Sequence, residues 1–391
     1  MQKRSRCLLL VLCLCVALLV PGFALAQEGG QVEFTDTSGH WAAEAISDWA
    51  GKGLVGGYPD GSFQPNAGIT RAEFMAIVNR AMGYQETVAI DFSDVEATDW
   101  FYAEVAKAVQ AGYITGYQDG TMQPKNRITR QEVATIISRL IKLTGDAEAI
   151  QSFADRQNIG AWCQEMVGAV VSGGYMGGYP DGTFQPKNPI TRAETVTVLQ
   201  RMTGELYNLP GTYGPEEEVE TIDGNVTINT GDITLQNTVI NGVLHLTAGI
   251  GDGDVLLKNV TVTGTAVISG GGENSIVLDR TELNNVVVER KDGKVRIVAQ
   301  NGSNIKIVVM QSGGILEQPE AEVNAFGEVV VRVPASDIPV ELVGGCDSIR
   351  VESAGVTLNI ASGTKVGNLE IAETAANSQI NLEKGSAVAS L

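Results

Sequence analysis

Residues 57–73 read GYPDGSFQPNAGITRAE, and the phrase returns as GYQDGTMQPKNRITRQE at 116–132 and as GYPDGTFQPKNPITRAE at 178–194. The copies lie about 60 residues apart, and a fixed period of this size is typical of tandem copies of one structural unit. A tryptophan precedes the phrase in every copy, at Trp41, Trp100 and Trp162. The repeats therefore predict three copies of one fold unit.

Each copy is predicted to form a helix, a loop and a second helix. In the first copy, apolar residues within 42–49 are spaced as on one face of an amphipathic helix. Residues 58–61 (Tyr-Pro-Asp-Gly) fit a type I turn. The second helix is predicted to begin at Thr70, because Thr70 and Glu73 have the spacing of a capping box.

An arginine follows the capping threonine in all three copies, at Arg71, Arg130 and Arg192. A cation in the first turn of a helix is disfavoured by the helix dipole, by ~0.3–1 kcal/mol. We therefore expect these arginines to contact a ligand; the alternative is an ion pair with a neighbouring acid. The planar guanidinium group suits bidentate binding of a carboxylate.

These phrases resemble the S-layer homology (SLH) family of bacterial cell-wall-binding modules, over roughly residues 34–205. The resemblance implies a pseudo-threefold bundle with binding grooves between adjacent repeats. It implies, as partner, a secondary cell-wall polysaccharide or a peptidoglycan-linked glycan, often carrying a pyruvate ketal whose carboxylate would meet the arginines. An indole suits the apolar face of a sugar, although core packing is an equal alternative for each tryptophan. The ligand-binding residues expected on this basis are Trp41, Trp100, Trp162, Arg71, Arg130, Arg192, Gly56, Gly116 and Gly177, with Lys125 and Lys187 making the second and third grooves the more cationic.

The N-terminus predicts export. Basic residues within 3–6 precede an apolar run at 7–20, and the small residues Ala24 and Ala26 follow, as in a signal peptide cleaved after Ala26. The run is short for a membrane span, which needs about 20 residues; an uncleaved anchor is the alternative. We expect no transmembrane segment once residues 1–26 are removed.

The charge and the cysteines narrow the class of protein further. The net charge of −19 argues against nucleic acid as a partner, because binding phosphates needs clustered Lys and Arg. The two cysteines beyond the leader, Cys163 and Cys346, are expected to be lone buried thiols and not a disulfide framework.

The composition changes after residue 207. Residues 208–220 combine turn formers with a run of glutamates and are predicted to be a linker. Beyond it, 233–247, 255–269 and 276–290 align with one another as short alternating strands separated by Asn or Gly. A coil of about 20 residues that is rich in β-branched residues is typical of a parallel β-helix.

A β-helix can carry a polysaccharide lyase or hydrolase, and this is the alternative function. The acids of this part (Asp252, Asp254, Asp279 and Glu282) are expected at solvated corners, and its one histidine is His245. Calcium at 251–254 has only one Gly-Asp pair to support it. We therefore predict no catalytic residue, no metal and no cofactor.

Together these observations predict an α + β multidomain protein, with an α-helical pseudo-trimer followed by a β-solenoid. The predicted function is that of a non-enzymatic, secreted cell-surface protein held on the wall, with S-layer components as one such kind. The end of the solenoid near 380–391 carries a weak cap and is a candidate for self-association. The predicted boundaries are 1–26 (leader), 34–90, 91–150 and 151–207 (repeats), 208–220 (linker) and 221–391 (β-helix).

Overall fold

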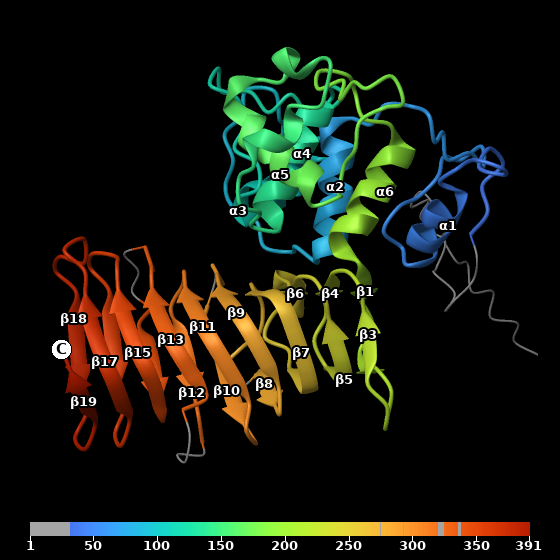
Figure 1. Ribbon diagram of the computed structural model, residues 1–391. Coiled ribbons are helices and arrows are strands. Elements are labelled where there is room, and N and C mark those ends of the chain that lie inside the picture. The colour runs from blue at the N-terminus through green and yellow to red at the C-terminus, as the bar shows by residue number, and fades with distance from the viewer. Residues whose placement is uncertain (1–31, 274, 292, 320–323, 335–337) are drawn as a thin grey trace, which may run out of the picture.

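The computed structural model describes residues 32–391 except 274, 292, 320–323 and 335–337, and it divides into a helical bundle and a β-solenoid (Figure 1). The predicted leader, 1–26, lies outside the described residues. Within the described part, no helix has the length and apolar character that a membrane span requires. The helices are α1 (Ala43–Gly51), α2 (Arg71–Met82), α3 (Tyr102–Ala111), α4 (Arg130–Leu140), α5 (Gln164–Ser172) and α6 (Arg192–Thr203), with short 3₁₀ turns at Ala147–Ile150, Arg156–Asn158, Ala161–Cys163 and Ala248–Ile250.

The second helix of each repeat begins at the predicted capping box. The backbone N–H of Thr70 donates to Glu73 Oε2 at 2.8 Å, and the backbone N–H of Glu73 donates back to Thr70 Oγ1 at 3.2 Å. The same reciprocal pair starts α4 and α6. Two of the four orphan amides at each helix start are satisfied locally in this way.

The three repeats form a closed ring. The first helix of each repeat packs on the second helix of the repeat before it: α3 on α2, α5 on α4, and α1 back on α6. At the centre, Ile69 N donates to Ile190 O, Ile190 N to Ile128 O and Ile128 N to Ile69 O, each at 3.1 Å. The predicted pseudo-threefold bundle is therefore confirmed. The two helices that pack together in it come from neighbouring repeats.

The second part is a parallel β-solenoid of about eight turns over residues 205–390, as predicted. Each strand pairs in parallel with its equivalent in the next coil, and inward side chains form one continuous apolar core. The strands are β1 (Glu205–Tyr207), β2 (Gly211–Tyr213), β3 (Glu220–Ile222), β4 (Val226–Ile228), β5 (Ile233–Ile240), β6 (Leu244–Leu246), β7 (Val255–Ile268), β8 (Ile276–Asp279), β9 (Glu282–Val288), β10 (Val295–Gln300), β11 (Asn304–Met310), β12 (Gly314–Glu317), β13 (Phe326–Val331), β14 (Val340–Val343), β15 (Gly345–Val351), β16 (Thr357–Ile360), β17 (Lys365–Ile371), β18 (Gln379–Leu382) and β19 (Ala387–Ser390).

Asparagines turn one corner of the coil. Asn237, Asn259 and Asn301 have φ values of 49°, 54° and 55°, in the left-handed region that asparagine tolerates better than most residues. Asn259 Nδ2 donates to Asn237 Oδ1 at 2.8 Å, so the side chains also link neighbouring coils. The asparagines at this corner therefore have the structural role that the sequence indicated.

The predicted linker at 208–220 is wrong. The solenoid begins at Glu205, directly after α6, and β2 pairs with β5 within the stretch that was assigned to the linker. Asn237 Nδ2 donates to the carbonyl oxygens of Pro215 and Glu216, which holds the acidic run as a corner of the first coil. Turn formers and charges here belong to a solenoid corner and not to a flexible tether.

The solenoid caps the bundle. Asn229 Nδ2 donates to Ala81 O at 2.9 Å, Asn225 Nδ2 to Met202 O at 2.8 Å and Lys291 Nζ to Ala111 O at 2.8 Å. These carbonyls belong to the last turns of α2, α6 and α3, where a helix leaves its acceptors unsatisfied. An ion pair from Lys142 to Glu289, at 2.8 Å, adds a fourth link beyond the end of α4. The bundle and the solenoid are therefore held together by specific hydrogen bonds and an ion pair.

Candidate binding grooves between the repeats

The arginine of each recurring phrase extends into the following repeat, so the three arginines link neighbouring repeats around the ring. The Nε groups donate to main-chain carbonyls: Arg71 to Met122 at 3.0 Å, Arg130 to Phe184 at 2.9 Å and Arg192 to Phe63 at 2.8 Å. All three side chains are buried. From a buried position, each arginine therefore satisfies main-chain acceptors of the neighbouring repeat, and the ligand contact expected from the sequence stays a prediction.

A glutamate and a tyrosine complete each interface. The guanidinium of Arg71 lies 2.9 Å from Glu132, that of Arg130 lies 3.3 Å from Glu194, and that of Arg192 lies 3.8 Å from Glu73. Tyrosine rings stack under the guanidinium carbons at 4.6–5.1 Å. The ion-pair alternative is thus what the geometry shows. We define the first groove as Arg71, Tyr117 and Glu132, the second as Arg130, Tyr179 and Glu194, and the third as Arg192, Tyr58 and Glu73.

The protonation states of the first groove are fixed by its hydrogen bonds. Burial alone would raise the pKa of Glu132, but hydrogen bonds from Thr129 and Tyr117 and the charge of Arg71 hold this pKa below its usual range. Burial and the bond to Glu132 raise the pKa of Tyr117 to about 12. Tyr179, bonded to Glu194, has its pKa raised to about 12 for the same reasons. Near neutral pH, the first groove therefore presents a carboxylate at Glu132 beside a neutral phenol at Tyr117.

The three recurring tryptophans lie on the surface. Trp41 and Trp100 are each 64% exposed and Trp162 is 56% exposed, whereas Trp49 is the tryptophan of the core. Core packing is therefore the wrong alternative for these three. Trp162 lies against Gly160, whose backbone N–H donates to Gln131 Oε1 at 3.1 Å, beside Arg130 at the start of α4. This places an exposed indole near the N-terminus of α4, the helix that begins at Arg130.

The glycines divide into two kinds. Gly56 and Gly177 face open space, and their carbonyls accept from Arg192 Nη2 at 2.8 Å and Arg130 Nη2 at 2.6 Å. Gly116 differs, since its φ is +75° and a Cβ there would lie 2.6 Å from the Phe92 ring. It is equivalent to Gly57 and Gly178, so the lack of a side chain there serves the close packing of the loop, and its role as a ligand contact stays a prediction.

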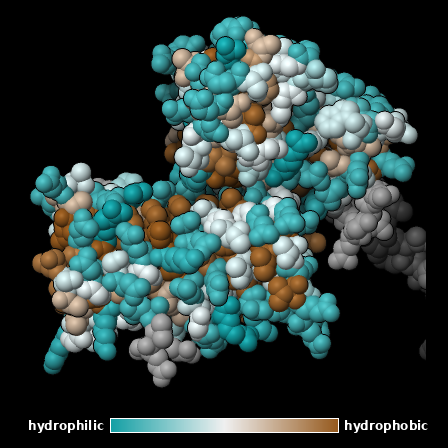
Figure 2. All heavy atoms as spheres, viewed as in Figure 1, coloured by the Kyte–Doolittle hydropathy of each residue, from teal (hydrophilic) through white to brown (hydrophobic). Residues whose placement is uncertain are grey.

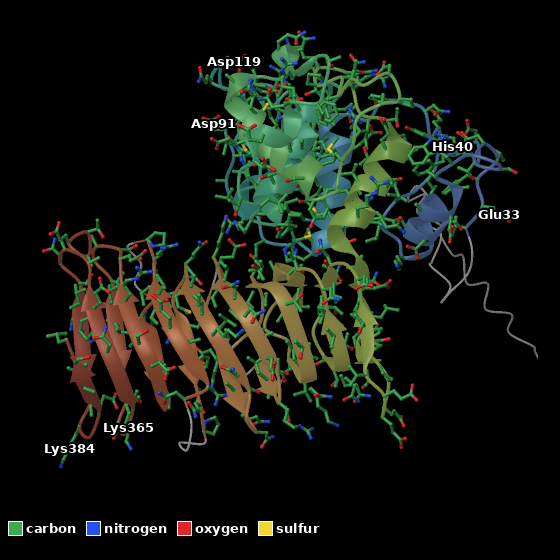
Figure 3. All side chains as sticks on the ribbon, viewed as in Figure 1. Glu33, His40, Asp91, Asp119, Lys365 and Lys384 are labelled. Atoms are coloured by element: carbon green, nitrogen blue, oxygen red, sulfur yellow. The ribbon has the colours of Figure 1, made fainter. Side chains whose placement is uncertain are left out.

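The two predicted lysines are both exposed. Lys125 Nζ lies 3.8 Å from Asp99 and 5.6 Å from the Phe101 ring centre. Lys125, Asp99, Gln123 and Asn126 line a hollow of about 410 Å³. Asp99 is the residue directly before Trp100 in the sequence. The loop carrying Asp119 lies at the end of the bundle remote from the solenoid (Figure 3).

Each repeat also opens with a Phe-x-Asp phrase, at residues 34–36, 92–94 and 153–155. The sequence analysis did not identify its aspartate as a residue that positions the loop. The carboxylate of Asp94 accepts from Met122 N and Gln123 N, both at 2.8 Å, and Asp36 and Asp155 do the same in their repeats. The glutamine so held has a positive φ in every copy, 53° at Gln123. The recurrence of Phe-x-Asp ahead of each loop was the signal that could have revealed this role.

We predict that Asp94→Ala lowers the stability of the bundle by about 1–3 kcal/mol, because two main-chain amides lose their acceptor. Thermal unfolding followed by tryptophan fluorescence measures the change. Asp91→Ala is the matched control, since Asp91 is an exposed aspartate three residues away. Equal melting temperatures for the two variants would contradict the positioning role.

Two of the four acids of the solenoid that the sequence analysis considered for catalysis form ion pairs. Asp252 lies 2.8 Å from Arg290, and Asp279 lies 2.9 Å from Arg280. His245 is buried on the side of the coil near Lys142; burial and that charge lower its pKa to about 4. Among the described residues, no group of His, Cys, Asp or Glu is placed to hold a metal ion. Cys163 and Cys346 are free and buried.

Comparison with known proteins identifies the three repeats. The S-layer homology domain family matches residues 33–75, 91–134 and 152–196. Cell surface glycoprotein 1 of Acetivibrio thermocellus is 38% identical over 37% of this chain and 7% of its own length. A cellulosome-anchoring protein of the same organism is 35% identical over 37% of this chain and 34% of its own length. An amylopullulanase of Thermoanaerobacterium thermosulfurigenes is 32% identical over 45% of this chain and 10% of its own length.

The chain thus carries three tandem S-layer homology domains, and the matched region spans about a third or less of each of these relatives. Such domains, together with the cell-surface relatives, identify a secreted protein that is associated with the cell wall.

Proposed function

We propose that this protein is held on the wall by a carboxylate-bearing secondary polysaccharide, for which a pyruvate ketal is the expected acidic group, bound in the grooves between the repeats. The observation that carries the proposal is the recurrence of an exposed tryptophan at the same place in all three repeats. Tryptophan is enriched at interaction surfaces, because it combines a large apolar face with a polar N–H group. An indole face matches the apolar face of a sugar ring, and the neighbouring polar groups can bind its hydroxyls.

The third groove is the best candidate for the carboxylate. Its Arg192–Glu73 separation is 3.8 Å, against 2.9 Å for Arg71–Glu132, so Arg192 is the least tightly neutralised of the three arginines. The open backbone at Gly56 lies next to it, because the Gly56 carbonyl accepts from Arg192. In the first groove the equivalent position is Thr115, which carries a side chain where Gly56 has none.

We further propose that the solenoid is displayed by the anchor and does not catalyse. In its support, Asp252 and Asp279 are engaged by arginines, and the paired carboxylates of a glycosidase need free faces on either side of a sugar bond. The amylopullulanase relative matches over only a tenth of its own length, so the similarity gives no support for the same activity in this chain. Release of reducing sugar from wall material by the purified chain would establish the enzymatic alternative instead.

Co-sedimentation with purified walls tests the anchoring. The full chain is expected to sediment with intact walls, to lose binding to walls stripped of secondary polysaccharide by hydrofluoric acid, and to bind weakly after mild acid removal of pyruvate. The peptidoglycan left after stripping is the matched control. Undiminished binding to bare peptidoglycan would contradict the polysaccharide as ligand, and unchanged binding after pyruvate removal would contradict only the acidic group.

A further inference from the structure

Two hollows lie side by side where the bundle meets the solenoid. The larger one, about 480 Å³, lies between the ends of α3 and α4 and the solenoid corner that follows β9. The smaller one, about 210 Å³, lies between the segment after α2, the end of α3 and the solenoid corner that follows β6. Tyr84, Ala111, Glu289 and Lys291 line both hollows, which therefore form one cavity, the seam cleft. Small-molecule sites measure ~300–1,000 Å³ and are often found between domains, so the seam cleft has the size and the position of a binding site.

The walls of the seam cleft are partly apolar and partly polar. Leu140, Leu143 and Met166 of the bundle line the larger hollow. Gln85 and Gln110 line the smaller one, and each carries an amide that both donates and accepts hydrogen bonds. Figure 2 shows apolar and hydrophilic side chains together along the line where the underside of the bundle meets the solenoid. A sugar ring, with an apolar face and a rim of hydroxyl groups, matches such walls.

Cations outnumber acids around the larger hollow. Arg139, Lys142 and Lys291 line it, and Glu289 is the one acid among the described residues of its lining. Glu289 is already paired, since Lys142 Nζ lies 2.8 Å from its carboxylate. Arg139 is exposed and forms no ion pair within the described part of the chain. In a protein with a net charge of −19, this local excess of positive charge favours an anionic ligand.

Lys291 caps a helix and yet is not fully neutralised. Its Nζ donates to Ala111 O at 2.8 Å, at the C-terminus of α3, where the helix dipole favours a cation. Gly112 leaves room for this contact, because a Cβ at that position would collide with Nζ. Burial lowers the pKa of Lys291, the charge of Lys142 lowers it further, and Glu289 offsets only part of this effect. An anion in the seam cleft would stabilise the charged form of Lys291.

Tyr84 adds a hydroxyl group that has no partner. Its ring stacks on Tyr113 with ring centres 5.9 Å apart, which fixes the side chain beside the cleft. The Tyr113 hydroxyl donates to Asn79 Oδ1 at 2.8 Å, whereas the Tyr84 hydroxyl makes no hydrogen bond to any residue that the structure describes. Burial and the charge of Glu289 raise the pKa of Tyr84, so the phenol stays protonated and able to donate. A ligand that brings an acceptor into the cleft would satisfy it.

We propose that the seam cleft binds an acidic sugar, that is, a saccharide unit with one carboxylate or phosphate group. The anionic group lies against Lys291, Arg139 and the Tyr84 hydroxyl, and the ring packs against the apolar wall. Binding needs both parts of the molecule, because Lys291 belongs to the solenoid and the other two residues belong to the bundle. The residues that define the three grooves lie outside the described lining of the cleft, so this site does not rest on the wall-anchoring proposal. It gives the solenoid a part in carbohydrate binding.

Titration of the chain without its predicted leader with glucuronate, glucose 6-phosphate and glucose tests the proposal. We expect at least one of the two acidic sugars to shift the backbone amide NMR signals of Gly112 and Gly249, which line the cleft. Uncharged glucose is expected to bind about tenfold more weakly, because it lacks the charge-assisted hydrogen bonds. Shifts confined to Gly56 and Gly177 would assign the acidic sugar to the grooves and overturn the proposal. Equal affinity for glucose, or no binding of either acidic sugar, would also overturn it.

Tyr84→Phe is the sharpest variant, because it removes one hydroxyl group and keeps the ring on Tyr113. The melting temperature is expected to stay unchanged, and the affinity for the acidic sugar is expected to fall about tenfold, as for the loss of one hydrogen bond to a charged group. Tyr102→Phe is the matched control, since Tyr102 is a half-buried tyrosine of the bundle outside the described lining of the cleft. Equal affinities of the two variants would contradict the proposed site. Co-sedimentation with walls, measured separately, would leave the anchoring function standing in that case.

Discussion

Arg130→Ala is expected to cost the bundle about 3–5 kcal/mol, enough to unfold a marginally stable domain, because it removes one partner of a buried ion pair. The substitution leaves Glu194 without its cation, and it leaves the carbonyls of Phe184 and Gly177 without their donor. It also removes the stacking of the guanidinium on Tyr179, at 4.6 Å. Chemical denaturation followed by tryptophan fluorescence reports on the bundle alone, since all four tryptophans precede the solenoid.

Arg139→Ala is the matched control for this prediction. Arg139 lies on the same helix, in its last turn, but is exposed. Its replacement is expected to change the unfolding free energy by no more than about 0.5 kcal/mol. If Arg130→Ala unfolds at the same denaturant concentration as Arg139→Ala, the bridge between the second and third repeats contributes nothing to stability.

Replacing Trp41, Trp100 and Trp162 together by alanine is expected to abolish detectable wall binding while the bundle stays folded. The indoles are largely exposed, so their loss leaves no cavity in the core. Stacking of an aromatic ring contributes about 0.5–1.5 kcal/mol beyond the area that it buries. A loss of about tenfold in affinity per groove becomes about a thousandfold when one polymer fills all three grooves.

Binding isotherms with purified wall polysaccharide, on the three single variants and the triple variant, measure this effect. Leu209→Ala is the control, because Leu209 is 58% exposed but lies on the solenoid. Retention of wild-type affinity by the triple variant, with an unchanged circular dichroism spectrum, would remove the tryptophans from the ligand-binding site. A loss confined to one single variant would identify the groove that dominates.

The local features of this chain were predictable because neighbouring residues cause them. Thr70 and Glu73 lie three residues apart and form their capping box wherever a helix starts. The coil length and the asparagine corners of the solenoid are equally local, because each coil repeats the same sequence of strand and turn. For these features, the repeat period in the sequence was sufficient to predict the local structure.

The arginines were misjudged because their partners are remote. The helix-dipole argument holds for an isolated helix, but Arg192 donates to the carbonyl of Phe63, which lies 129 positions earlier in the chain. No sequence pattern states which main-chain acceptor will be buried beside a guanidinium. The linker was misjudged for a related reason: Pro215 and Glu216 look like a tether until Asn237 of the next coil holds their carbonyls.

The closed ring also sets the order in which the chain can fold during export. Helix α1 emerges first, yet its apolar face packs on α6, and Gln200 contacts Asp48 across 152 positions of sequence. Contacts this distant form late, after the entropy of closing a long loop has been overcome. We expect the first repeat to leave the membrane unpartnered and to remain sensitive to surface proteases until the third repeat arrives. A chain that ends before residue 192 lacks α6, so we expect Trp49 of α1 to stay exposed in it. We expect proteases to degrade such a chain before it binds the wall.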